Sequence, residues 1–88
     1  MILNRGHNPT APLSLAQAVP GGSYYVESVS GPEQQRLRLC ELGIVTGAPV
    51  SVVTCSREGM LVIKVGGSRM ALSPGMTEHV FVQKTTSR

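Results

Sequence analysis

The chain has 88 residues, of which 41% are hydrophobic and 15% charged; this combination fits one small folded domain and excludes both a multidomain enzyme and a disordered polymer. Eight Lys and Arg residues against five Glu residues leave a net charge of +3, with no Asp and no Trp. The basic residues are scattered and the only aromatic residues are two Tyr and one Phe, so we expect no nucleic-acid binding.

Nothing in the sequence predicts export or membrane insertion. The first residues lack the apolar core of a signal peptide, and no run of about 20 apolar residues could span a bilayer. Two cysteines without a CxxC spacing are typical of reduced thiols rather than of a disulfide framework. We therefore expect a cytoplasmic protein.

The folded domain is expected to cover residues 13–84. A flexible N-terminal tail is predicted over 1–12, because this stretch is rich in Asn, Gly, Pro and Thr, and a short C-terminal tail over 85–88. Between the tails, short β-branched segments alternate with Gly and Pro turn signals. This pattern is typical of a small β-rich domain.

Two local signals open the domain. Ser14 and Gln17 have the spacing of a capping box, which predicts a single helical turn over 15–18, and the Pro-Gly-Gly sequence that follows ends it. A first strand is predicted over 23–29, where Tyr and Val are frequent.

One α-helix is predicted to end at Leu42. Ser30 and Glu33 have capping-box spacing at its start. Gly43 follows the helix and can take the left-handed conformation of a Schellman motif, in which Ile44 contacts the last turn. Both ends of this helix are therefore predicted from local signals.

After the helix the hydrophobic pattern changes to period two, which predicts antiparallel strands. The expected strands are 49–55, 60–65, 69–72 and 78–83. Short Gly-containing loops join the first three, and a helical turn at Pro74 precedes the last. Five strands and one helix favour a small barrel, since closure removes exposed strand edges.

Catalytic and metal-binding residues are scarce. A cysteine nucleophile would need a histidine beside it, and neither His7 nor His79 has a spacing that supplies one. A metal site needs three or four converging ligands. Glu78 and His79 are neighbours on a predicted strand, so their side chains should point to opposite faces. We predict no enzyme, no metal site and no cofactor, and keep a divalent metal ion as a minor alternative.

The cysteines and methionines are predicted to pack in the fold rather than to bind a ligand. Cys40 is expected to be buried, because it lies on the helix among leucines and free cysteine is among the most buried residue types. Cys55 is also expected to have a structural role, although its position at a strand end beside the hairpin loop could expose it to solvent. The methionines at alternating strand positions are predicted to lie in the core; they are Met60, Met70 and Met76.

The charged residues of the helix admit two interpretations. Glu33 with Arg36, and Arg38 with Glu41, have i to i+3 spacing and could pair along a solvated face. The same residues could instead contact a partner, because Arg is enriched at interface hot spots and this helix should protrude from a small barrel.

The segment Arg38-Leu39-Cys40-Glu41-Leu42-Gly43-Ile44, followed by Gly47 and the strand 50–53, resembles the signature of the FeoA family, the small ferrous iron transport protein A. The order of the other motifs is similar to the family's pattern over about residues 13–83. These motifs are Leu13-Ser14-Leu15, Pro20-Gly21, Val65-Gly66, Met70-Ala71-Leu72-Ser73 and Glu78-His79-Val80.

The resemblance implies a mainly β fold, a small SH3-like β-barrel with one inserted α-helix. It also implies a cytosolic accessory of FeoB, the membrane protein with a GTP-binding domain that imports Fe²⁺. On this interpretation the protein docks on the cytosolic face of FeoB, is recruited to the inner membrane through that partner, and modulates GTP-dependent import by protein contacts.

Six exposed residues are the candidates for partner binding. They are Gln34, Arg38, Glu41, Arg57, Glu58 and Arg69. Two other interpretations stay open. An Fe²⁺-binding metallochaperone or metal-sensing module would use ligands such as Glu78, His79 or Cys55, and self-association could occur through uncovered strand edges.

Overall fold

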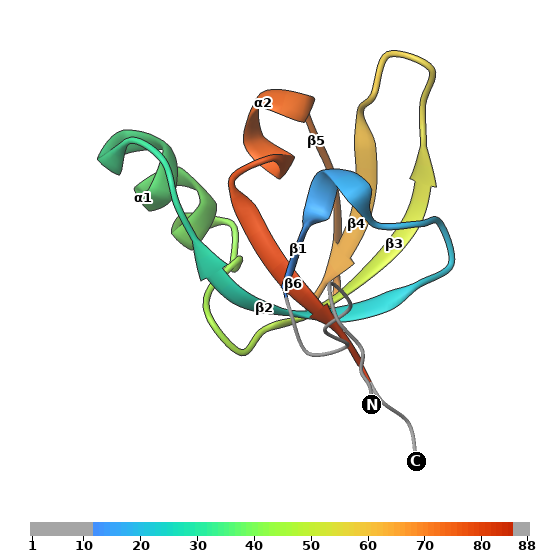
Figure 1. Ribbon diagram of the computed structural model, residues 1–88, viewed down its shortest axis with the longest axis horizontal. Coiled ribbons are helices and arrows are strands. Elements are labelled where there is room, and N and C mark those ends of the chain that lie inside the picture. The colour runs from blue at the N-terminus through green and yellow to red at the C-terminus, as the bar shows by residue number, and fades with distance from the viewer. Residues whose placement is uncertain (1–11, 86–88) are drawn as a thin grey trace, which may run out of the picture.

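The computed structural model describes residues 12–85, which form a bent antiparallel sheet with helical segments along it (Figure 1). The helical segments are the 3-10 turn η1 (Leu15–Gln17), α1 (Glu33–Glu41) and α2 (Pro74–Thr77). The strands are β1 (Leu13–Ser14), β2 (Ser23–Val29), β3 (Pro49–Cys55), β4 (Leu61–Val65), β5 (Ser68–Leu72) and β6 (Val80–Lys84). The predicted mainly β fold is confirmed. The predicted tails lie outside the described residues, apart from Pro12 and Thr85.

The strand order in the sheet is β1-β6-β2-β3-β4-β5, so β6 pairs with both β1 and β2 near the start of the domain. Two β-bulges interrupt the register. One lies between Val26 and Ser28 on β2 and the other between Val52 and Thr54 on β3. A bulge bends its strand and increases the local twist. The two long strands therefore curl the sheet around one face, which holds the core.

The core is apolar apart from the hydroxyl groups of Thr77 and Tyr24, and the Tyr24 hydroxyl accepts a hydrogen bond from the N–H of Val19 (3.1 Å). Its buried hydrophobic members are Leu15, Ala18, Tyr24, Val26, Leu39, Ile44, Val50, Val52, Leu61, Ile63, Val65, Leu72, Val80 and Val82. Met70 and Met76 pack against this cluster and are partly buried, and Met60 is half-buried. Met70 and Met76 thus pack at the edge of the core rather than within it, and the expected strand positions are wrong for Met60, which precedes β4, and for Met76, which lies in α2.

The end of α1 is built as its sequence predicts. Leu42 is the C-cap residue and Gly43 follows it with a φ of +93°. The N–H of Ile44 donates to the carbonyl of Leu39 (3.0 Å) and the N–H of Gly43 donates to that of Cys40 (3.0 Å). These two hydrogen bonds define a Schellman motif.

The start of α1 differs from the prediction. Pro32 occupies the N-cap position and no side chain caps the first turn, so the expected capping box between Ser30 and Glu33 does not form. The Oγ of Ser30 instead contacts His79. A tertiary contact has therefore replaced the local one.

The strand predictions are correct for β2 and β3, differ by one residue at the start of β4 and of β5, and need a larger correction at the C-terminal end. The last strand begins at Val80, so Glu78 and His79 lie in the turn between α2 and β6 rather than on a strand. The short strand β1 was not predicted, because a two-residue strand carries no periodicity. The predicted capping box of Ser14 and Gln17 is present at η1.

Candidate functional site

Helix α1 is attached to the sheet along one narrow side and lies at one end of the molecule (Figure 1). Only Leu39 is buried, and seven of the nine α1 residues are exposed. A helix turns about 100° per residue, so Leu37, two positions before Leu39, points away from the sheet. Its side chain is 55% exposed. Most of the α1 surface is therefore available for contact.

Three of the predicted partner-binding residues share one side of this helix. Gln34, Arg38 and Glu41 have i, i+4 and i+7 spacing, which places them in one row, and all three are exposed. Arg38 and Glu41 form no ion pair, and neither do Glu33 and Arg36; the ion pair found in residues 12–85 joins Glu78 and His79. The expected ion pairs are therefore absent, whereas the solvated face is present, because all four charged residues are exposed.

The other three predicted residues are exposed but lie elsewhere. Arg57 and Glu58 form the tip of the β3–β4 hairpin, which stands on the opposite side of α2 from α1 (Figure 1). Arg69 is paired with Lys64 near the other end of β4. The structure thus separates the six candidates into a helix face, a hairpin tip and an edge strand.

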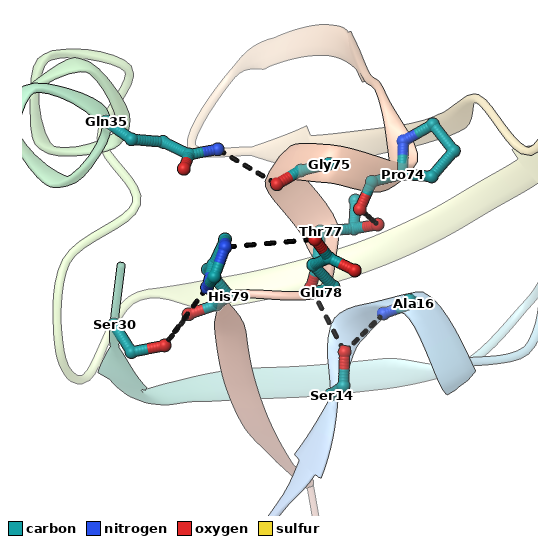
Figure 2. A network of polar contacts seen from close by, with 9 residues as sticks. All are labelled: Ser14, Ala16, Ser30, Gln35, Pro74, Gly75, Thr77, Glu78 and His79. Atoms are coloured by element: carbon teal, nitrogen blue, oxygen red, sulfur yellow. Dashed lines mark hydrogen bonds and ion pairs between the residues drawn. The ribbon is translucent and has the colours of Figure 1, made fainter. Parts of the chain in front are cut away.

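A polar network centred on His79 fixes the start of α1, and Figure 2 shows it at close range. The N–H of Ser30 donates to the carbonyl of His79 (2.8 Å), and the Oγ of Ser30 lies 3.3 Å from Nδ1 of the same residue. On the other side of the ring, Nε2 lies 3.8 Å from Oε2 of Glu78. His79 therefore connects the chain entering α1 to the turn before β6.

Two further hydrogen bonds hold the first turn of α1. The Gln35 side chain donates to the carbonyl of Gly75 in α2 (2.9 Å), and Nε of Arg36 donates to the carbonyl of Gly31 (3.0 Å). Sequence reasoning missed the contacts of Ser30 and Gln35, because their partners are 49 and 40 positions away along the chain. The network ties the start of α1 to α2 and to the turn before β6.

The geometry of Glu78 and His79 corrects the argument made from the sequence. Because these residues lie in a turn, their side chains approach each other instead of pointing to opposite faces. Two ligands are fewer than a metal site requires. Across the described part of the chain, no three His, Cys, Asp or Glu side chains gather closely enough to hold a metal ion.

Cys40 corrects a second expectation, since it is exposed and not buried. Its position on α1 is one residue beyond Leu39, and a 100° turn carries its side chain off the narrow buried side. Cys55 is exposed as well, at the end of β3 beside the hairpin.

Both thiols are expected to react in the folded protein, because the reagent can reach each without unfolding. Titration with a chromogenic disulfide under native conditions should label two thiols per chain, the same number as in denaturant. The variant Cys40→Ser should label once. Protection of Cys40 in the native wild-type protein would show that α1 packs differently.

A family model for the FeoA domain matches residues 13–84. The chain belongs to the FeoA family. Membership of the FeoA family implies a role in ferrous iron transport, and the family consists of small accessory domains that are not known as enzymes. A comparison with curated protein sequences found no match.

Solved FeoA structures agree with the family match. Stenotrophomonas maltophilia FeoA complexed with zinc, described as a prokaryotic SH3 domain protein, is 32% identical with a TM-score of 0.71, covering 81% of this chain and 89% of that chain. An FeoA described as an iron uptake regulatory protein is 29% identical with a TM-score of 0.79, covering 85% and 100%. The SH3-like fold predicted from the sequence is confirmed.

The same fold occurs in a larger class of protein. A manganese-dependent transcriptional repressor is 16% identical with a TM-score of 0.80, covering 91% of this chain and 44% of that chain. At this identity the likeness shows the fold alone. No helix within residues 12–85 is long and apolar enough to cross a membrane.

Proposed function

We propose that this FeoA-family protein is a cytoplasmic accessory of ferrous iron uptake that docks on the cytosolic face of the FeoB transporter. Docking recruits it to the inner membrane and modulates GTP-dependent Fe²⁺ import through protein contacts. The proposal assigns no catalytic step and no cofactor to the chain.

The position of α1 is the observation that carries this proposal. The helix is held at its start by the His79 network and in its last turn by Leu39, while seven of its nine residues stay exposed. A surface that is attached to the rest of the fold loses less conformational freedom when it binds than a free segment does. The row of Gln34, Arg38 and Glu41 adds polar and charged groups that can specify a partner.

The test is co-elution of the purified protein with detergent-solubilised FeoB from the same cell. Arg38→Glu reverses a charge on the helix face and is expected to weaken the complex at least about tenfold. Arg57→Glu makes the same charge reversal on the hairpin tip and measures whether the tip also contributes to binding FeoB. Lys84→Glu, on β6, is the matched control and should co-elute as the wild-type protein does.

The metal requirement is measured in the same experiment, with metal-free protein and with anaerobic Fe²⁺. Co-elution in both states supports a docking module, and co-elution only with Fe²⁺ supports metal-gated docking. Failure of the wild-type protein in both states would contradict the proposal and favour the metallochaperone interpretation. Equal co-elution of Arg38→Glu and Lys84→Glu would remove α1 from the interface.

A further inference from the structure

The outer strand β5 has one side without a strand neighbour. It stands at the end of the sheet order and, among residues 12–85, pairs with β4 alone. An open strand edge presents main-chain N–H and C=O groups to which another extended chain can bond.

The turn between β4 and β5 determines which residues face the open side. Val65 pairs with Ser68 across a two-residue turn, in which Gly66 has a φ of +61°. In such a hairpin the pair that closes the turn exchanges hydrogen bonds, and the following pairs alternate. The main-chain groups of Arg69 and Ala71 therefore point toward the open edge.

The solvent face of this edge is basic. Lys64 and Arg69 are directly opposite each other in the register, and both are exposed. In a pair without main-chain hydrogen bonds the Cα atoms are about 4.5 Å apart, so two cationic side chains start from neighbouring positions, and like charges directly opposite each other are destabilising. Strands β3, β4 and β5 contain no acidic residue, and neither cation belongs to the ion pair found in residues 12–85. The charge is uncompensated within the described chain.

We propose that the β5 edge binds an extended acidic segment of a partner protein as an added strand. A carboxylate beside Arg69 neutralises the repelling pair. On the other face an apolar side chain covers Met70, which is half-buried. Ala71 is exposed and small, so it leaves room for the incoming chain. The expected segment alternates acidic and apolar residues.

A second copy of this chain is a poorer occupant of the same edge. Pairing of two β5 strands brings two Lys64–Arg69 pairs into one short ladder, and like charges on neighbouring strands are destabilising. The same cations that oppose self-pairing attract an acidic strand. Charge complementarity therefore selects the acidic partner over the second copy.

The peptide acetyl-Val-Glu-Val-Glu-Val-Glu-Val-amide tests the proposal, because its pattern is the same in both chain directions. Added to isotope-labelled protein, it is expected to shift the amide resonances of Arg69 and Ala71. It should also slow their hydrogen exchange at least about tenfold, since both amides gain hydrogen-bond partners. The corresponding peptide with Lys in place of Glu is expected not to bind.

Two variants assign the binding to the basic pair. Arg69→Glu should bind the acidic peptide at least about tenfold more weakly, whereas Lys84→Glu, the same charge change on β6, should bind as the wild-type protein does. Lys64→Ala removes the repulsion, so it should be at least as stable as the wild-type protein yet bind the acidic peptide about twofold to fivefold more weakly.

Several results would overturn the proposal. They are an acidic peptide that leaves both amides unperturbed, equal binding of the Lys peptide, and equal weakening by Lys84→Glu and Arg69→Glu. Slowed exchange of β5 with phosphatidylglycerol vesicles but not with the peptide would also overturn it, because the edge would then recognise a membrane surface. None of these measurements involves the transporter, so the result is independent of the proposed docking through α1.

Discussion

Replacement of Leu39 by alanine is expected to destabilise the protein by about 3 kcal/mol, within the range measured for buried leucines. Leu39 is completely buried and is the only α1 side chain in the core. Its loss removes the apolar contact that holds the last turn of α1 against the sheet. A domain of this size has a total stability of about 5 to 10 kcal/mol, so the change is a large fraction of it.

The matched control lies on the same helix. Leu37→Ala removes the same atoms from a side chain that is 55% exposed, and it should change the stability by less than about 0.5 kcal/mol. Chemical denaturation measures both values, and hydrogen exchange shows whether the α1 amides of Leu39→Ala are released before those of the sheet. Equal effects of the two variants would mean that α1 is not anchored through Leu39.

Replacement of Gly31 by alanine is expected to destabilise the protein by about 2 to 3 kcal/mol, from two sources. The residue has a φ of +103°, which side chains rarely adopt, and a Cβ atom would lie only 3.1 Å from Cγ of His79 and 3.2 Å from its Nδ1. Because this glycine leads into α1, the ring must move or the helix must shift. Either change should reduce docking through α1.

Gly47 separates backbone strain from the contact with His79, since it has a φ of +92° and open space where a Cβ would lie. Gly47→Ala should therefore show backbone strain alone, about 1 to 2 kcal/mol. The excess cost of Gly31→Ala should disappear when His79 is also replaced by alanine, which a double-mutant cycle measures by denaturation. Equal costs for the two glycines would show that the histidine ring does not confine Gly31.

Elements with short-range signals were predictable from the sequence. The capping box of η1 needs only Ser14 and Gln17, and the end of α1 needs a glycine that can adopt a positive φ after the last turn. The ranges of β2 and β3 follow from alternation and turn residues. Each of these features depends on atoms a few positions apart, so the order of the residues contains the necessary information.

The candidate site was predictable in part. Exposure of Gln34, Arg38 and Glu41 on one helix face follows from helical spacing, and the structure confirms it. Their separation from the hairpin tip and from Arg69 did not follow, because the sheet order determines which loops meet. Whether any of these residues binds a partner stays a prediction.

The sequence by itself determined the turns, the helix end and the strand pattern, and through its ordered motifs it indicated the FeoA family. Only the tertiary structure decided that His79 bonds to Ser30, that Cys40 is exposed, and that Glu78 and His79 face each other. The local sequence was equally compatible with a capping box at Ser30, a buried thiol at Cys40 and a strand through Glu78 and His79. For Ser30 and His79 the choice depended on contacts between the chain entering α1 and the turn before β6, which are distant in sequence and form only when the sheet has curled. For Cys40 it depended on which side of α1 packs on the sheet through Leu39.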